Sequence, residues 1–119
     1  MWKIKKGLLE TLLESSQRYY PDEFMCFLGG KRKEKLLDEI VMLPTINGKN
    51  FASFQQNLVP IDDSIIGTFH SHPTGPANPS SADKKLFQKY EVNFILSLSG
   101  QVFRAFDRNG KELLVELIE

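Results

Sequence analysis

An apolar run that ends in two histidines, followed by a loop rich in proline and glycine, constrains the fold of this chain most strongly. Residues 65–72 read Ile-Ile-Gly-Thr-Phe-His-Ser-His, and the loop that begins at Pro73 leads into Ser80-Ser81-Ala82-Asp83. The β-branched and aromatic residues predict a strand over 65–72. A serine with an acid three residues later predicts the start of a helix. The sequence therefore predicts a strand, a loop and a helix in succession, with polar side chains at both ends of the loop.

The two histidines are spaced to bind one metal ion. On a strand, residues i and i+2 point to the same face, roughly 6.5 Å apart along the chain. His70 and His72 can therefore converge on a single ion while Ser71 points the other way. Asp83 adds a carboxylate, and three protein ligands leave a fourth tetrahedral position open, as in catalytic zinc sites. The pattern predicts a small metal-dependent hydrolase with His70, His72 and Asp83 as the metal ligands.

Each of these residues also has a simpler interpretation. Two histidines on a strand can be half-buried residues that bond to carbonyl groups, and Ser80 with Asp83 matches a helix capping box. Two histidines and one carboxylate also describe the facial triad of non-haem iron oxygenases. That triad usually takes its second histidine from a separate strand, whereas His70 and His72 lie within three residues. Zinc is therefore favoured over iron.

A zinc hydrolase also needs a group that takes a proton from the attacking water. Glu23 is the best candidate, because it follows the helix-breaking Pro21 at the start of the apolar run Phe24 to Leu28. An exposed acid at the start of a strand has the same sequence context. Spacing alone does not place Glu23 beside the metal.

The remaining sequence predicts one compact α+β domain over residues 1–119, which is long enough for a hydrophobic core. Leucines at helical spacing predict a helix from 7 to about 19. A second helix is expected from 80 to about 90. Strands are expected at 24–28, where Gly29-Gly30 should end the strand, and at 36–43, 51–59 (ambiguous), 65–72, 92–98, 102–106 and 112–118. These elements predict a curved, mostly antiparallel sheet flanked by helices.

Composition narrows the class of protein. Fifteen Lys and Arg balance fifteen Asp and Glu, so there is no electrostatic case for nucleic-acid or membrane binding. The short basic cluster Lys31-Arg32-Lys33 is interpreted as a solvated turn. No signal peptide or transmembrane segment is apparent, and the single Cys26 excludes an intrachain disulfide and suggests a reducing compartment. We expect a cytoplasmic protein.

The joint pattern resembles the signature of the JAMM, or MPN-plus, metalloproteases. It consists of Glu23, the run His70-Ser71-His72-Pro73, six residues, Ser80, two further residues and Asp83. The stretch from Pro21 to Gly30 also looks like the strand that carries the glutamate in that family. The resemblance covers essentially the whole chain and fits a stand-alone MPN domain of the prokaryotic kind found in archaea.

The resemblance implies a role for each residue of the pattern. His70, His72 and Asp83 would hold one Zn2+ per chain. Glu23 would act as the general base, and Ser80 would donate a hydrogen bond to the oxyanion. The implied activity is that of an isopeptidase or peptidase that cleaves after the C-terminal Gly-Gly of ubiquitin-like modifier or sulfur-carrier proteins. Those proteins and their conjugates would be its partners.

Two other functions share this pattern. A catalytically silent MPN scaffold would bind such proteins without cleaving them, but silent members typically lose a ligand or the glutamate, and this chain keeps all of them. A zinc hydrolase that processes small adducts of sulfur-carrier proteins would use the same chemistry on a different leaving group.

Overall fold

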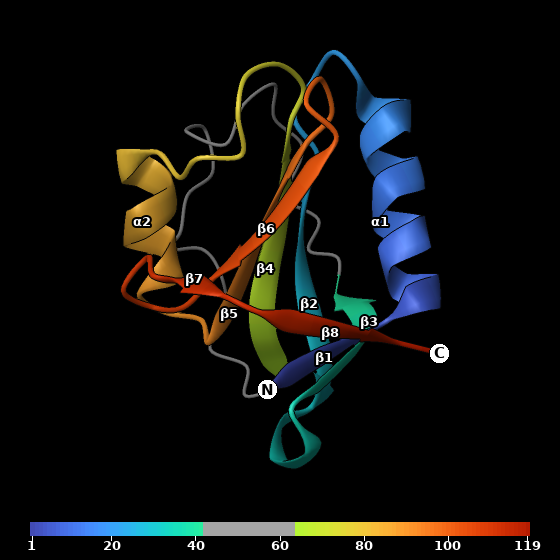
Figure 1. Ribbon diagram of the computed structural model, residues 1–119, viewed down its shortest axis with the longest axis vertical. Coiled ribbons are helices and arrows are strands. Elements are labelled where there is room, and N and C mark those ends of the chain that lie inside the picture. The colour runs from blue at the N-terminus through green and yellow to red at the C-terminus, as the bar shows by residue number, and fades with distance from the viewer. Residues whose placement is uncertain (42–63) are drawn as a thin grey trace.

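The computed structural model describes residues 1–41 and 64–119 of the chain (Figure 1). In chain order the elements are β1 (Trp2–Lys5), α1 (Lys6–Tyr19), β2 (Met25–Lys31), a 3-10 turn η1 (Arg32–Glu34), β3 (Leu36–Val41), β4 (Ile65–His72), α2 (Ser81–Phe87), β5 (Val92–Ser97), β6 (Val102–Phe106), β7 (Glu112–Leu113) and β8 (Val115–Ile118). The strand expected at 51–59 and the end of the one expected at 36–43 lie outside the described residues. Within the described ranges, no helix has the length and apolar character needed to span a membrane.

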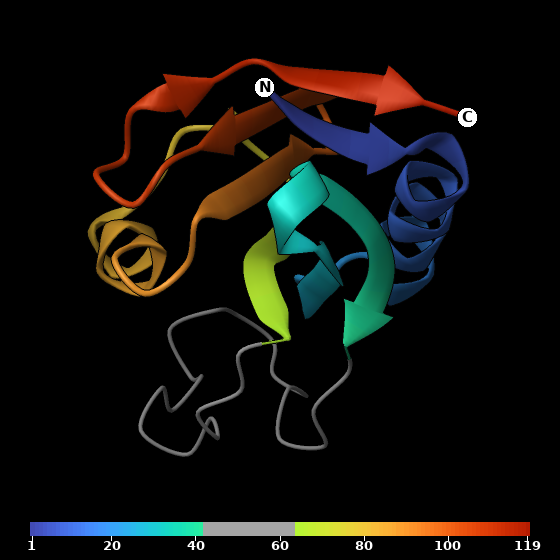
Figure 2. The same ribbon diagram turned by 90° about the horizontal axis from the view of Figure 1, so that it is seen from below.

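The described strands form one curved sheet in the order β7-β6-β5-β4-β2-β3-β1-β8 (Figure 2). The pairs β1–β3, β1–β8 and β4–β5 are parallel. The other four pairs are antiparallel. The two helices lie on opposite sides of this sheet (Figure 1). The predicted α+β fold, a curved and mostly antiparallel sheet flanked by helices, is confirmed.

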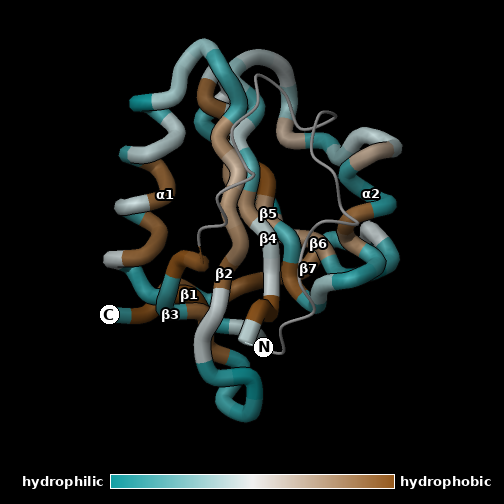
Figure 3. Tube along the Cα trace, turned by 180° about the vertical axis from the view of Figure 1, so that it is seen from behind, coloured by the Kyte–Doolittle hydropathy of each residue, from teal (hydrophilic) through white to brown (hydrophobic). Residues whose placement is uncertain are grey.

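The helices bury one face each. Leu8 and Leu12 of α1 pack with Cys26 and Leu28 of β2 in the larger core cluster. Leu86 of α2 packs on the opposite face of the sheet, in a second cluster with other β2 and β4 residues. Apolar residues concentrate in the central strands and along part of α1, whereas the turn after β2 is hydrophilic (Figure 3). Residues 31–35 are exposed, as expected for a solvated turn.

The expectation that Gly29-Gly30 ends its strand is wrong. β2 continues to Lys31, with a register shift against β3 between the two glycines. A Cβ atom on Gly30 would lie 2.0 Å from the carbonyl oxygen of Leu36. Gly30 therefore permits a close approach of two backbones at a bulge, which is a recognised use of glycine within a strand.

β4 carries the two histidines through the middle of the sheet, between β2 and β5. Ile66 and Phe69 both pack in the core cluster under α1, although strict alternation would place residues three apart on opposite faces. The register between β2 and β4 shifts between Leu28 and Gly29, which marks a bulge. The extra residue at a bulge interrupts the alternation of faces, so Ile66 and Phe69 can lie on the same face. Downstream of it, His70 and His72 share the face that α2 covers.

Gly67→Ala is expected to lower the free energy of unfolding by about 1–3 kcal/mol, the usual range for overpacking a core. A Cβ atom on Gly67 would lie 2.2 Å from the carbonyl oxygen of Val92, and β4 and β5 would have to separate. Gly7→Ala is the matched control, because among the described residues no atom lies within 4 Å of its added Cβ. Urea unfolding of the two variants checks this, and a Gly67→Ala protein as stable as the wild type would contradict it.

Candidate metal centre

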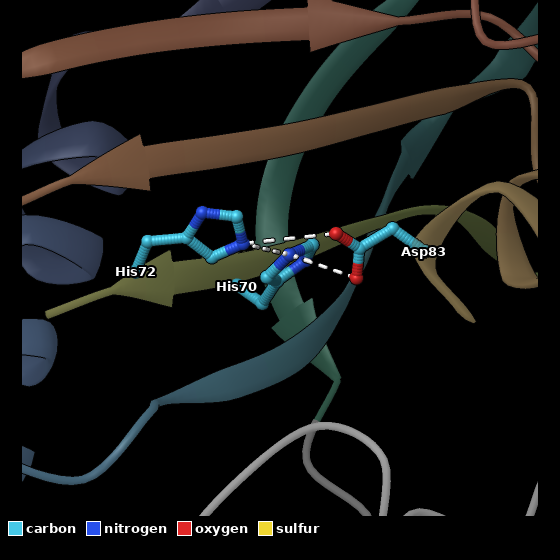
Figure 4. Close-up of side chains that lie close together, drawn as sticks. All are labelled: His70, His72 and Asp83. Atoms are coloured by element: carbon cyan, nitrogen blue, oxygen red, sulfur yellow. Dashed lines mark hydrogen bonds and ion pairs between the residues drawn. The ribbon is translucent and has the colours of Figure 1, made fainter. Parts of the chain in front are cut away.

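Three side chains that can bind a metal come together between β4 and α2 (Figure 4). The Nε2 atoms of His70 and His72 lie 3.1 Å apart. In Asp83, Oδ1 lies 3.2 Å from Nε2 of His70, and Oδ2 lies 3.6 Å from Nε2 of His72. The structure thus brings together the three residues that the sequence predicts as metal ligands.

The spacing and the chemistry of these atoms fit zinc. Two ligand atoms that are each about 2.0–2.1 Å from a tetrahedral ion lie about 3.4 Å from one another, and the three measured separations scatter around that value. Imidazole nitrogen and carboxylate oxygen are ordinary zinc ligands. The side chains of His70 and Asp83 are buried, whereas that of His72 is 18% exposed. The cluster is therefore reached by solvent on the His72 side.

The start of α2 fixes Asp83 in place. The Oγ of Ser80 accepts a hydrogen bond from the N–H of Asp83 at 3.1 Å, and Oδ2 of Asp83 accepts one from the N–H of Ser80 at 2.8 Å. This is the predicted capping box. The same carboxylate completes the helix end and faces both histidines, so its capping role does not compete with metal binding.

A backbone carbonyl orients His72. Nδ1 of His72 lies 2.9 Å from the carbonyl oxygen of Pro76. Because a carbonyl only accepts, Nδ1 carries the proton and the neutral ring has its lone pair on Nε2. Nε2 is the nitrogen that faces His70 and Asp83. Metal-binding histidines commonly hold their second nitrogen in this way.

The electrostatics of the cluster favour a charged carboxylate. Burial alone would raise the pKa of Asp83, but its hydrogen bonds with His70 and His72 outweigh burial and hold that pKa well below its usual range. The hydrogen bond with Asp83 is the main cause that raises the pKa of His72, against the opposing effect of burial. An ionised carboxylate beside two imidazoles is the protonation state that a divalent cation requires.

The stability of the zinc-free protein is expected to fall as the pH rises above about 6.5, the ordinary pKa of histidine. A raised pKa in the folded state means that protonated His72 stabilises the fold, and this contribution is lost as the pH rises through the raised pKa. The lowered pKa of Asp83 keeps its own contribution constant over that range. Urea unfolding of zinc-free protein across this range measures the trend, and Asp83→Asn should flatten it. A trend that survives in that variant would contradict this account.

Glu23 lies beside the segment that carries the histidines. The N–H of Phe24 donates to the Oγ of Ser71 at 2.9 Å, and the N–H of Ser71 donates to the carbonyl of Phe24 at 2.9 Å. These two bonds hold the residue after Glu23 against the residue between the two histidines. Glu23 is half-buried, and its negative charge contributes to the raised pKa of His72. The fold thus brings Glu23 within electrostatic reach of the cluster.

Sequence reasoning did not identify the groups that hold the cluster in place. Pro76 acts through its carbonyl, which carries no signal of residue type. Ser71 acts through its Oγ, which accepts a hydrogen bond from the N–H of Phe24. The position of Ser71 between two histidines was the only signal that could have indicated this contact.

The family described as prokaryotic homologs of the JAB domain matches residues 5–109 of this chain. A protein of Haloferax volcanii named "Probable metalloprotease" is 29% identical in an alignment that covers 91% of this chain and 74% of that protein.

Two solved structures are similar over nearly their whole length. One, described as "JAMM: A Metalloprotease-like Zinc Site in the Proteasome and Signalosome", is 29% identical with a TM-score of 0.78, covering 100% of this chain and 99% of that chain. The other, a JAB1/MPN domain protein from Archaeoglobus fulgidus, is 32% identical with a TM-score of 0.76, covering 98% of this chain and 99% of that chain.

Proposed function

Because this chain belongs to the family of prokaryotic JAB-domain homologs, we propose that it is a zinc-dependent isopeptidase or peptidase that cleaves after the C-terminal Gly-Gly of ubiquitin-like modifier or sulfur-carrier proteins. The family, the relative named as a metalloprotease and the cluster of metal-binding groups together support a metal-dependent peptidase. The identity of the metal as zinc, the bond that is cleaved and the substrate are what we propose beyond this.

The observation that carries the proposal is the cluster of three metal-binding side chains, one of which is hydrogen-bonded to Ser80. His70, His72 and Asp83 supply three ligand atoms at zinc spacing. A hydrolytic zinc site keeps its fourth position for water or substrate, and the ion lowers the pKa of a water to about 7. Glu23 and Ser80 then supply what the metal ligands lack, a proton acceptor and a hydrogen-bond donor.

Glu23 takes the proton of the attacking water and later returns it to the leaving amine. General acid–base catalysis of this kind contributes about 10²–10⁴-fold to a rate. Phe24, the next residue, is hydrogen-bonded to Ser71 between the two histidines, and the negative charge of Glu23 raises the pKa of His72. Both observations support a position near the site. Glu23 precedes β2 and is not one of the three clustered ligand residues, so we assign its carboxylate to the proton of the water and not to the metal.

Ser80 donates a hydrogen bond to the oxygen that becomes negatively charged as the carbonyl is attacked. Its Oγ accepts from the N–H of Asp83, and a serine hydroxyl that accepts still has its own proton to donate. Ser80 is exposed at the helix start, where substrate can approach. The loss of one oxyanion donor typically lowers kcat about 10²–10³-fold.

The proposed substrate class follows from the family resemblance. A Gly-Gly tail is small and extended, so it can approach an open zinc site without steric conflict and can dock beside a strand by main-chain hydrogen bonds. The leaving group is then the side-chain amine of a lysine or the amine of another residue. Modifier or sulfur-carrier proteins joined through such tails are the expected partners.

Cleavage of a reporter in which Gly-Gly is joined to a lysine side chain tests the proposal. Zinc-loaded protein should release the lysine product, a chelator should stop the reaction, and added zinc should restore it. A reporter with Val-Val before the same lysine is the matched control and should resist cleavage. If zinc binds one per chain and neither reporter is cleaved, the isopeptidase assignment is wrong and a silent scaffold is favoured.

A further inference from the structure

The loop between β4 and α2 is held by side chains from the neighbouring hairpin of β5 and β6. The Oγ of Ser97 donates to the carbonyl of Gly75 at 2.6 Å. Nη1 of Arg104 donates to Oδ1 of Asn78 at 2.6 Å and to the carbonyl of Ala77 at 3.3 Å. Two strand residues therefore anchor the loop at two points.

The carbonyl that orients His72 lies between these two anchor points. Pro76 follows Gly75 and precedes Ala77, and its oxygen accepts the hydrogen bond of Nδ1 of His72. A shift of the loop would move this oxygen relative to the imidazole ring. We therefore expect the orientation of His72 to depend on Ser97 of the neighbouring strand β5 and on Arg104 of β6, two strands away.

Packing fixes this loop at Ala77, which lies in a core cluster with Phe87, Ile95 and Phe106. Gly75, Pro76 and Asn78 are exposed, and residues 75–78 line an open hollow of about 420 Å³ together with residues of β5 and β6. Among these four residues only Ala77 is buried. On either side of Ala77, hydrogen bonds from the hairpin to Gly75 and Asn78 hold the exposed part of the loop.

Arg104 is itself held by a carboxylate and an aromatic ring. Its Nε and Nη2 atoms donate to the two carboxylate oxygens of Glu112 at 3.1 and 2.9 Å. Its Cζ atom lies 4.9 Å from the centre of the Phe106 ring. A guanidinium in a two-point carboxylate pair has a fixed plane, so Nη1 points at the loop in a defined direction.

We propose that Arg104 is a positioning residue of the metal centre, which holds Ala77 and Asn78 so that the carbonyl of Pro76 keeps Nε2 of His72 directed at the metal. This inference rests on the proposed function, because it takes His72 to be a metal ligand. Among the described residues, the contacts of the Arg104 side chain are with Ala77, Asn78, Glu112 and Phe106, so it would act on His72 through the loop.

The test is the zinc affinity of the purified protein, measured by competition with a chromophoric chelator. Groups that support a metal ligand typically contribute 10–100-fold to metal affinity. Arg104 acts through one further contact, so Arg104→Met is expected to weaken zinc binding about tenfold, at the low end of that range. The visible absorption of the cobalt-substituted protein should also change, because it reports the geometry of the ligands.

Arg32→Met is the matched control. Arg32 also joins a glutamate and a backbone carbonyl, with Nε 2.6 Å from Glu91 and Nη2 3.2 Å from the carbonyl of Ile65. That carbonyl belongs to the first residue of β4, at the opposite end of the strand from His72. This variant should bind zinc like the wild type and show the same cobalt spectrum.

A second variant keeps the test decisive if Arg104→Met does not fold. Arg104→Lys keeps the charge, but its three donors share one nitrogen and lack the planar fork that reaches Glu112 and the loop at once, so it should also weaken zinc binding. Wild-type affinity in a folded Arg104 variant overturns the inference alone. Zinc binding that is absent from the wild type, or unchanged in His72→Ala, overturns the proposed function and the inference with it.

Discussion

Glu23→Gln is expected to remove nearly all hydrolysis and to leave zinc bound. Glutamine has the shape of glutamate but cannot take a proton from water, so kcat should fall by about 10²–10⁴-fold, the usual contribution of a general base. Zinc affinity should not fall, because Glu23 is outside the three-residue cluster. Reporter kinetics and zinc content, measured on the same preparation, check both parts.

Asp22→Asn is the matched control for Glu23→Gln, since it removes a neighbouring carboxylate from the same short segment between α1 and β2. It should retain both zinc and activity. If Glu23→Gln cleaved the reporter at the wild-type rate, Glu23 would not be the base. If it lost zinc, Glu23 would be acting on the metal site and not on the water.

Asp83→Asn is expected to weaken zinc binding by more than the 10–100-fold typical of losing a supporting contact. The substitution replaces the one charged oxygen ligand with a neutral amide. The amide oxygen can still accept the N–H of Ser80, so the capping box that Oδ2 of Asp83 completes is largely kept. Zinc titration and urea unfolding of the zinc-free variant separate the loss of the metal from a loss of the fold.

Ser80→Ala provides the complementary control for Asp83→Asn. It removes the hydroxyl that accepts from the N–H of Asp83 and should lower stability by about 1 kcal/mol, the usual effect of losing a helix N-cap. It leaves the carboxylate and both histidines in place, so zinc should remain bound while hydrolysis falls. Equal zinc affinity in Asp83→Asn and the wild type would exclude Asp83 as a ligand.

The strand that carries the histidines was predicted to the residue. Its apolar run begins at Ile65 and Pro73 ends it, so residue type and backbone chemistry agree on both boundaries. The family match over residues 5–109 confirms the resemblance. The sequence could indicate it because the pattern from Glu23 to Asp83 combines five side chains of defined type and order. The capping box at Ser80 and Asp83 was also predicted from two residues alone.

Elements that depend on distant contacts were missed or misjudged. β1 has only four residues and is defined by its pairing with β3 and β8, which no local pattern indicates. The strand expected over 112–118 is divided at Leu114, because its first part pairs with β6 and its second part with β1. The second helix ends at Phe87 instead of about 90, and the N–H of Lys89 and Tyr90 bond three residues back in a tighter turn.

The candidate site shows the same division between local and distant information. Residue types and spacing identified the atoms that face a metal, but not the groups that direct them. Arg104 contacts the loop across 26 and 27 residues of sequence, and Pro76 contributes only a carbonyl. Such contacts become visible only when the sheet brings the hairpin and the loop together.

The position of bound zinc tests the central claim most directly. Crystals of zinc-loaded protein, measured on both sides of the zinc absorption edge, should show one anomalous peak per chain. The account predicts that this peak lies about 2.0–2.2 Å from Nε2 of His70, Nε2 of His72 and a carboxylate oxygen of Asp83. A peak elsewhere, or none at these residues in protein that carries zinc, would contradict the assignment of the metal centre and of the hydrolysis built on it.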